Sequence, residues 1–173
     1  MAISLYDLSV PTYLQTLGAV GHFLERGLKH FQENGGSLEE IVETRLFPDM
    51  LPFRFQVQSA VHHSVHALEA VKSGMFVPAR GDASEGYAAL QTRVREAIDA
   101  LGKITPDEIN AREGAQVVFE IGPNKLPFTA ENFVLSFSLP NFHFHATTAY
   151  DILRSKGVPL GKRDYMGRVR INR

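Results

Sequence analysis

The fold class is set by residues 10–31, VPTYLQTLGAVGHFLERGLKHF. Their apolar stripe recurs at alternating steps of four and three residues: Val10, Leu14, Leu17, Gly21, Leu24, Leu28 and Phe31. This spacing predicts an amphipathic α-helix with one apolar face. We expect Ser9 to cap its start and Pro11 to lie in its first turn. Gly35 or Gly36 is expected to end it.

Two more long helices with the same periodicity follow. One begins after Asp49, which we expect to cap it, and ends near Gly74. The other spans about residues 87–101, after a loop that contains Gly, Pro and Asp. The sequences SLEE at residues 37–40 and TPDE at residues 105–108 predict short helices that open with a capping box.

The last long helix is expected to run from Thr129 to about Ser155. Pro140 lies inside it, where a proline removes one backbone hydrogen bond and bends the helix. The preceding residues 116–129, QVVFEIGPNKLPFT, place β-branched and aromatic side chains around Gly-Pro-Asn-Lys, which predicts a β-hairpin. Residues 158–173 show no periodicity and are expected to form an extended surface segment.

Four amphipathic helices with one apolar stripe each bury those stripes together only as a bundle. The sequence therefore predicts an all-α four-helix bundle with a small β-hairpin between the third and fourth long helices. The 173 residues fit a single domain, expected to span residues 1–173. A chain of this length buries a core without disulfides or a structural metal.

The composition excludes several functions. The chain has no cysteine, which excludes thiol catalysis and thiolate zinc sites and leaves histidine and carboxylates as metal ligands. Lys and Arg number 18 against 19 Asp and Glu, so we expect no binding to nucleic acid or to a membrane surface. The sequence shows no targeting segment and no long apolar run, and a cytoplasmic protein is expected.

Two histidines stand close together in the last helix, within LPNFHFHATTAYDILR at residues 139–154. Each helical residue rotates by about 100°, so His143 and His145 point roughly 200° apart and do not chelate one ion together. His145 lies in the middle of the apolar stripe. Polar residues on or near its face are expected to form a buried or ligand-binding cluster with it: Ser138, Asn141 and Thr148. The pattern fits a hydrogen-bonded core histidine as well as a metal ligand or acid-base group.

A second histidine cluster lies in AVHHSVHALEA, residues 60–70. His62 and His66 are four residues apart and share one helix face, a spacing that zinc and other divalent ions use. Measured against the apolar stripe of this helix, both face outward, and His63 faces outward on the other flank. The cluster is interpreted either as a solvated polar face or as part of a subunit interface that includes Phe55.

Three stretches of the chain resemble a known bacterial family. They are SLYDLSVP at residues 4–11, FPDMLPFRFQVQ at residues 47–58 and PNFHFHATTAYDILRSKGVPLGKRDY at residues 140–165. In them the chain resembles a family of domains of unknown function that is grouped with the DinB/YfiT-like superfamily of metalloenzymes. The likeness covers nearly the whole chain. It implies a four-helix bundle that assembles as a homodimer.

The resemblance also implies a divalent metal, commonly nickel or zinc. In the superfamily it is held by one histidine from the second helix and an H-x-x-x-H pair from the last. This sequence departs from that pattern, because Asn141 stands four residues before His145 and Ala149 four residues after it. The resemblance therefore transfers only His145 as a metal ligand.

Two functions of different classes remain. The favoured one is a dimeric small-molecule-binding or interaction module that lacks the full three-histidine metal site and carries no cofactor. The alternative is a divalent-metal-dependent enzyme of the thiol transferase or hydrolase type, in which a Ni or Zn ion bound by His145 activates water or a thiol. The sequence leaves open whether the protein is an enzyme, and it identifies no substrate or reaction.

Overall fold

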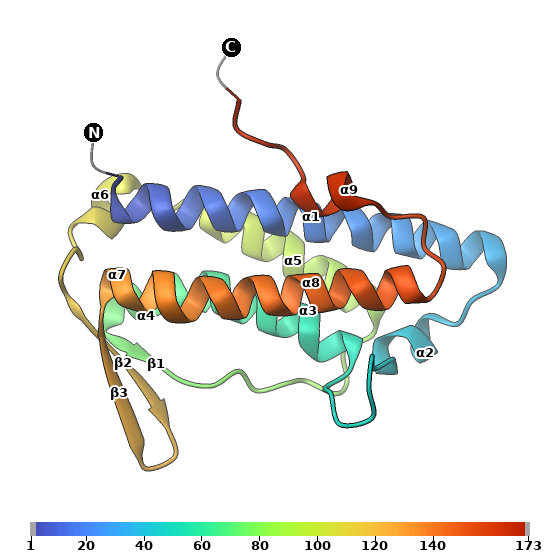
Figure 1. Ribbon diagram of the computed structural model, residues 1–173, viewed down its shortest axis with the longest axis horizontal. Coiled ribbons are helices and arrows are strands. Elements are labelled where there is room, and N and C mark those ends of the chain that lie inside the picture. Colours follow the sequence, from blue (N-terminus) through green and yellow to red (C-terminus); the bar gives the residue numbers. More distant parts are fainter. Residues whose placement is uncertain (1–2, 172–173) are drawn as a thin grey trace.

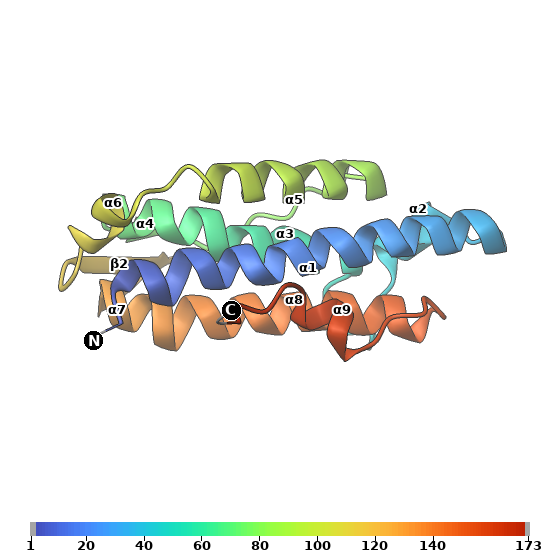
Figure 2. The same cartoon turned by 90° about the horizontal axis from the view of Figure 1, so that it is seen from above.

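The computed structural model describes residues 3–171, which are mostly helical with a small three-stranded sheet (Figure 1). Four long helical segments make up most of it, and two of them contain a π-helical stretch, labelled η. The segments are α1 (Leu5–Asn34); α3, η1 and α4 (Phe53–Val61, His62–His66, Ala67–Ser73); α5 (Tyr87–Leu101); and α7, η2 and α8 (Ala130–Asn132, Phe133–Ser138, Leu139–Ser155). Contacts of α1 with α5, α5 with α3, α3 with α8 and α8 with α1 enclose a shared core (Figure 2).

The remaining elements are short. Three helices connect or cover the long segments: α2 (Leu38–Glu43), α6 (Pro106–Asn110) and α9 (Lys162–Met166). The three strands are β1 (Met75–Phe76), β2 (Gln116–Ile121) and β3 (Asn124–Thr129). The sheet lies at the end of the molecule where α4 and α7 are found, and the β2–β3 pair projects away from the helices (Figure 1).

The sheet contains one strand that the sequence did not predict. β2 pairs antiparallel with β3, and β1 pairs in parallel with the other edge of β2, with Met75 opposite Val118. β1 has two residues, which is too short for an alternating pattern to be visible. It begins directly after Gly74, whose positive φ of 88° ends α4 and redirects the chain towards β2.

The first helix begins earlier than the sequence indicated. Its N-cap is Ser4, whose hydroxyl accepts a hydrogen bond from the backbone of Asp7. The prediction that Ser9 caps the helix is therefore wrong: Ser9 is buried inside α1 and donates to the Leu5 carbonyl at 2.7 Å. Pro11 accordingly lies inside the helix and not in its first turn. The predicted end is confirmed, because Gly35 takes a left-handed φ of 74°.

The second long segment also starts away from its predicted cap. Asp49 precedes the helix by several residues, and α3 begins at Phe53 after Pro52, which has extended backbone and no side-chain cap. Pro52 determines this start because its ring fixes φ and excludes a helical conformation for the residue before it. The capping box predicted for the second short helix is confirmed at Thr105 and Glu108. In the first, Ser37 caps the helix by accepting from the Glu40 backbone, which is one half of the predicted box.

The core is built from apolar side chains of all four long segments. Its largest fully buried aromatic members are Tyr13, Phe23, Phe53, Phe133 and Phe142. Close packing requires Gly27 in α1, because a Cβ there would lie 2.4 Å from the Tyr87 hydroxyl oxygen. That hydroxyl donates a hydrogen bond to the Leu24 carbonyl at 2.8 Å. Helices α1 and α5 therefore meet at a position where a side chain does not fit.

The C-terminal segment is not simply extended. Residues 162–166 form α9, which packs on α1. Asp164 accepts a hydrogen bond from Arg26 of α1 at 2.6 Å and another from the backbone of Gly161 at 2.7 Å. A helix of five residues shows no periodicity, so the sequence did not reveal it. None of the helices within residues 3–171 has the length and apolar character needed to cross a membrane.

Candidate functional site

The candidate site lies where the π-helical stretches η1 and η2 meet. Ser138, the last residue of η2, donates a hydrogen bond to the His63 carbonyl in η1 at 2.6 Å. The Tyr13 hydroxyl lies 2.7 Å from Ser138 Oγ and donates to it, since the one hydrogen of Ser138 is already used. Burial raises the pKa of Tyr13, which keeps the phenol protonated. This chain of bonds joins three helical segments at the π turns, a type of irregularity that is frequent at functional sites.

His63 points into the molecule from η1. Its side chain is 8% exposed, and its ring packs against that of His145 with centroids 5.8 Å apart and an interplanar angle of 17°. Burial lowers the pKa of His63 to about 3, with a further contribution from the neighbouring His145 and His62. Among residues 3–171, His63 Nδ1 finds no hydrogen-bond partner. His63 is thus a buried, neutral imidazole with one nitrogen that no described side chain or backbone group bonds.

His145 faces His63 from α8 and is held by Gln56 of α3. Its Nδ1 lies 2.8 Å from Gln56 Oε1, and the amide nitrogen of Gln56 donates to the Leu51 carbonyl at 2.7 Å. That second bond fixes the orientation of the amide, so Gln56 accepts and His145 Nδ1 carries the proton. Burial lowers the pKa of His145 to about 4. At neutral pH its Nε2 therefore carries a lone pair.

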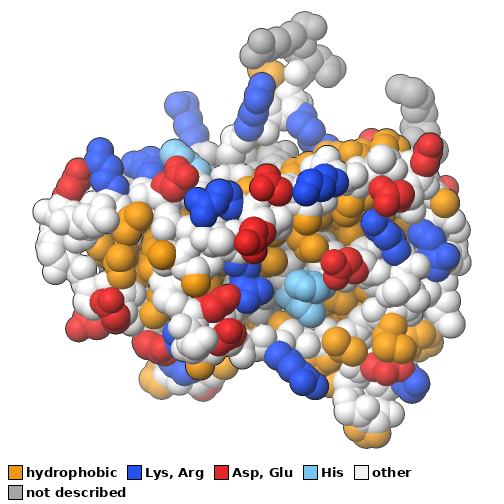
Figure 3. All heavy atoms as spheres, turned by 180° about the vertical axis from the view of Figure 1, so that it is seen from behind, with side chains coloured by type: hydrophobic (Ala, Val, Ile, Leu, Met, Phe, Trp, Pro, Cys, Tyr) orange, Lys and Arg blue, Asp and Glu red, His pale blue; other side chains and the backbone are white. Residues whose placement is uncertain are grey.

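His62 and His66 line a groove beside this histidine pair. The groove has a volume of about 670 Å³, and it is lined by Gln58, His62, His66, Val77, Pro78, Ala79, Arg80, Arg93, Glu120 and Gly122. Its walls come from α3 and η1, the loop after β1, α5 and the tip of the β2–β3 hairpin. Figure 3 shows the corresponding face, where histidine side chains reach the surface among acidic, basic and hydrophobic side chains. The groove therefore contains positively charged, negatively charged and neutral hydrogen-bonding side chains.

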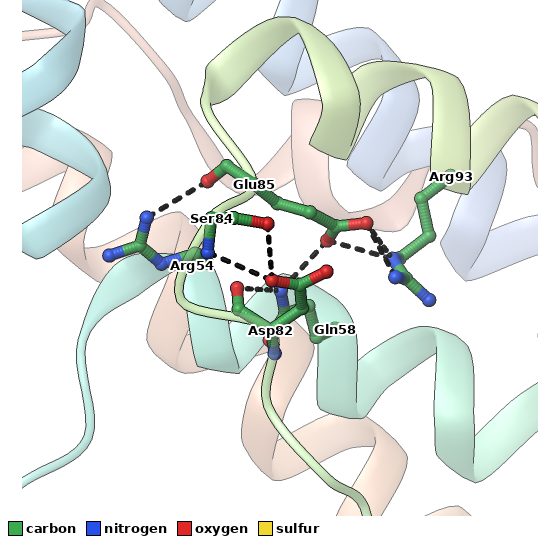
Figure 4. A network of polar contacts seen from close by, with 6 residues as sticks. All are labelled: Arg54, Gln58, Asp82, Ser84, Glu85 and Arg93. Atoms are coloured by element: carbon green, nitrogen blue, oxygen red, sulfur yellow. Dashed lines mark hydrogen bonds and ion pairs between the residues drawn. The ribbon is translucent and has the colours of Figure 1, made fainter.

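A polar network holds the loop that forms one wall of the groove (Figure 4). Glu85 accepts hydrogen bonds from Arg93 at 2.5 and 2.9 Å and from Gln58 at 2.7 Å. The Gln58 amide also donates to the Asp82 carbonyl and accepts a hydrogen bond from the Asp82 backbone N–H. Burial alone would raise the pKa of Glu85, but the bonds from Arg93 and Gln58 outweigh it and lower the pKa. The loop is thus fixed to α3 and α5 by charged and neutral bonds together.

The polar residues predicted to surround His145 have separate partners. Ser138 reaches across to η1, as described above. Asn141 donates to the Phe137 carbonyl and Thr148 to the Phe144 carbonyl, each at 2.7 Å and within their own helical segment. His143 points elsewhere, with Nδ1 3.2 Å from the Tyr165 hydroxyl of α9. The polar partner of His145 is Gln56, which the sequence analysis did not single out.

The prediction that His63 faces outward is wrong. It assumed a rotation of about 100° per residue along the whole helix. In η1 the hydrogen bonds span five residues in place of four, so each residue rotates by less and the register shifts. This stretch begins only at His62, so its effect on His63 is small. His63 lies on the same helix face as the buried residues Gln56 and Ser59, and that face packs against α8, where His145 lies, while His62 and His66 line the groove. The apolar stripe marks only one buried face of this helix, and the second buried face carries polar residues such as Gln56 and Ser59, which give no hydrophobic signal.

The residues at this site do not match the three-histidine cage that the resemblance implies. Within residues 3–171, no group of three or more His, Asp or Glu side chains is placed to hold a metal ion. His63 and His145 provide two imidazoles, and one nitrogen of His145 is bonded to Gln56. Catalytic zinc is usually held by three protein ligands. The donor set therefore falls short of that cage.

The fold is shared with a solved structure, a DinB family member protein from Shewanella denitrificans. The TM-score is 0.81 and the identity 24%, over 98% of this chain and 95% of that chain. The protein is thus a mostly helical protein with a DinB-like fold. A family model described as "Domain of unknown function (DUF1993)" matches residues 5–166, so the chain belongs to the DUF1993 family. The search of curated proteins found no match.

Proposed function

We propose that this DUF1993 protein is a four-helix bundle that binds a small molecule in the groove beside η1, functions as a homodimer and lacks the three-histidine metal site of the DinB superfamily. The observation that carries the proposal is the groove itself. Its volume of about 670 Å³ lies within the range of small-molecule sites, about 300–1,000 Å³. Its walls converge from segments that are far apart in the sequence.

The chemistry of the groove favours a polar ligand. His62 and His66 offer imidazole nitrogens, Arg80 a guanidinium group and Glu120 a carboxylate. Burial lowers the pKa of His62, so its ring is neutral near pH 7 and acts as both donor and acceptor. A small organic molecule with an acidic group and hydrogen-bonding substituents matches this set.

The test uses a substitution that fills the groove but leaves its polar side chains unchanged. We expect at least one compound from a panel of organic acids, amines and thiols, tested with EDTA present, to raise the thermal unfolding midpoint of the wild-type protein. Ala79→Trp, which occupies the groove, should abolish the shift. Ala111→Trp, on an exposed residue at the end of α6, should preserve it. Equal stabilisation of the wild type and Ala79→Trp would place the ligand elsewhere.

The alternative function is a metal-dependent enzyme that uses His145. One observation favours it: the Nδ1–H of His145 is donated to Gln56, an arrangement that metal-bound histidines commonly adopt. Elemental analysis of untagged protein distinguishes the two functions. One ion per chain that is lost in His145→Ala, but retained in His30→Ala, would favour the enzyme. Without such an ion, the groove remains the proposed site.

The proposed homodimer is supported by exposed apolar side chains. Phe47 is 64% exposed and Phe144 57% exposed. Contiguous exposed apolar patches mark surfaces that contact another protein, and we propose that these two side chains belong to such a surface. Light scattering at micromolar concentration should give twice the chain mass of 19.2 kDa, and a value near 19.2 kDa would rule the dimer out.

A further inference from the structure

We propose that His62 and His66 form a site for one late first-row divalent ion, Cu²⁺, Ni²⁺ or Zn²⁺, in which two imidazoles bind and water completes the coordination. The site is separate from His63 and His145, and it does not depend on the groove binding an organic molecule. Both rings line the groove, and His66 is exposed while His62 is half-buried.

The spacing of the two rings suits a shared ion. Their centroids are 5.1 Å apart, and their planes are inclined by 30°. A metal–nitrogen bond of about 2.0–2.1 Å places each ring centroid about 3.2 Å from the ion. If the nitrogen–metal–nitrogen angle is tetrahedral, the two ring centroids are then about 5.2 Å apart, and if it is a right angle they are about 4.5 Å apart. The observed separation lies between these values, close to the tetrahedral one.

His62 is already oriented as metal-binding histidines usually are. Its Nε2 donates to the Val77 carbonyl at 2.8 Å, which leaves the lone pair on Nδ1. A ligand histidine that donates its other N–H to a backbone carbonyl has a fixed tautomer and a more basic ligating nitrogen. Val77 thus positions His62 for an ion.

The surrounding charges are mixed and compatible with a cation. Glu69 lies near enough to His62 to affect its charge, and Glu120 lines the groove. Of the arginines that line the groove, Arg93 is neutralised by its double hydrogen bond to Glu85, while Arg80 remains as a positive charge. Because two imidazoles are the only histidine ligands here, the ion keeps open positions that an acidic ligand or water occupies.

The choice of ion follows from the ligand type. Imidazole nitrogen suits Cu²⁺, Ni²⁺ and Zn²⁺, and the affinity for a given site rises from Mn²⁺ through Ni²⁺ to Cu²⁺ and falls again at Zn²⁺. The hard ions Mg²⁺ and Ca²⁺ prefer oxygen ligands and should not compete. The expected order of affinity is therefore Cu²⁺ first, then Ni²⁺ and Zn²⁺, with Mn²⁺ much weaker.

The experiment titrates untagged protein with CuCl₂ and ZnCl₂ by calorimetry. We expect one ion per chain in the wild type, and His66→Ala should weaken binding at least about tenfold, because it removes one of two ligands. His30→Ala is the matched control, since it removes a histidine away from the groove, and it should bind as the wild type does. Circular dichroism checks that each variant is folded.

An electron paramagnetic resonance spectrum of the Cu²⁺ complex gives an independent measurement. We expect hyperfine structure from two nitrogen ligands in the wild type and from one in His66→Ala. Binding that survives in the double variant His62→Ala/His66→Ala would overturn the proposal, and so would a wild-type spectrum identical to that of Cu²⁺ in buffer. Binding lost in His145→Ala but retained in His66→Ala would also overturn it and assign the ion to the histidine pair in the interior.

Discussion

The polar residues around the π turns determine how the two halves of the candidate site face each other. The bonds from Tyr13 through Ser138 to the His63 carbonyl are buried and join η2 to η1. An unpaired buried polar group costs about 1–3 kcal/mol, whereas a made hydrogen bond adds only about 1 kcal/mol. The network is therefore sensitive to the loss of its central hydroxyl.

Ser138→Ala should lower the free energy of unfolding by about 2 kcal/mol, since it leaves both the Tyr13 hydroxyl and the His63 carbonyl without their partner. Urea unfolding at pH 7 measures the change. Ser136→Ala is the matched control, because Ser136 is exposed and bonds only the Asn132 carbonyl of its own segment. A loss below about 0.5 kcal/mol in Ser138→Ala would show that the network contributes little.

The half-buried His145 and the buried His63 make stability depend on pH. Burial lowers the pKa of His145 from its ordinary value of 6.5 to about 4. Between these two pH values the imidazole is protonated in the unfolded chain but neutral in the folded chain. The free energy of unfolding is therefore unaffected by this group above pH 6.5, and it decreases as the pH falls from 6.5 towards 4. His63, with a pKa of about 3, acts in the same direction.

Urea unfolding of His145→Gln at pH 7 and pH 5, with EDTA present, checks this contribution. The wild type should lose stability between these values, and the variant should lose about 1–2 kcal/mol less, because its side chain does not titrate. His30→Gln should follow the wild type. An unchanged slope in His145→Gln would mean that this imidazole titrates normally in the folded protein.

At the scale of elements, the packing of α1 against α5 depends on one glycine. Gly27 leaves room for the Tyr87 hydroxyl, which bonds the Leu24 carbonyl. Gly18, in the same helix, is exposed and has no atom near the place where a Cβ would lie. The two glycines therefore allow the same substitution to be compared in opposite environments.

Gly27→Ala should destabilise the protein by about 1–3 kcal/mol, because the added methyl displaces Tyr87 and strains a packed interface. Gly18→Ala should stabilise it by about 0.5–1 kcal/mol, since alanine loses less backbone entropy than glycine in a helix. Thermal unfolding of the two variants measures both signs. Stabilisation by both substitutions would show that α1 moves to accommodate the extra methyl.

At the scale of the whole molecule, the loop after β1 joins the sheet to α3 and α5. Arg54, which is 8% exposed, donates to the Glu85 carbonyl and pairs with Glu43 in α2. Together with the bonds of Gln58 and Arg93 to Glu85, this contact fixes the loop across several segments (Figure 4). The groove wall therefore depends on the network as a whole.

Glu85→Gln should loosen the loop, since the neutral amide does not accept two charge-assisted bonds from Arg93. Hydrogen exchange of the backbone amides of residues 77–84 should become faster, while exchange in the centre of α1 should not change. Glu33→Gln, which changes an exposed surface pair, provides the control. Exchange at residues 77–84 that matches the wild type would show that the loop is held by its backbone contacts alone.

The sequence alone determined the helical elements and several of their ends. Apolar residues at helical spacing marked the long segments, Gly35 and Gly74 ended two of them, and Ser37 and Thr105 capped the short ones. These features depend on local physics, namely the helical period, the hydrogen bonds of a cap and the backbone freedom of glycine. For the same reason the helical period placed His143 and His145 on different faces, and their partners are indeed different: Tyr165 of α9 for His143 and Gln56 of α3 for His145.

Only the tertiary structure decided the direction of His63, the bond from His145 to Gln56, the pairing of β1 and the docking of α9. Each depends on residues distant in the sequence. The π turn in η1 illustrates the cause: a helix accepts a wider turn only where contacts such as the bond from Ser138 to the His63 carbonyl compensate for it. Such contacts exist only after the segments have packed, so no local pattern encodes them.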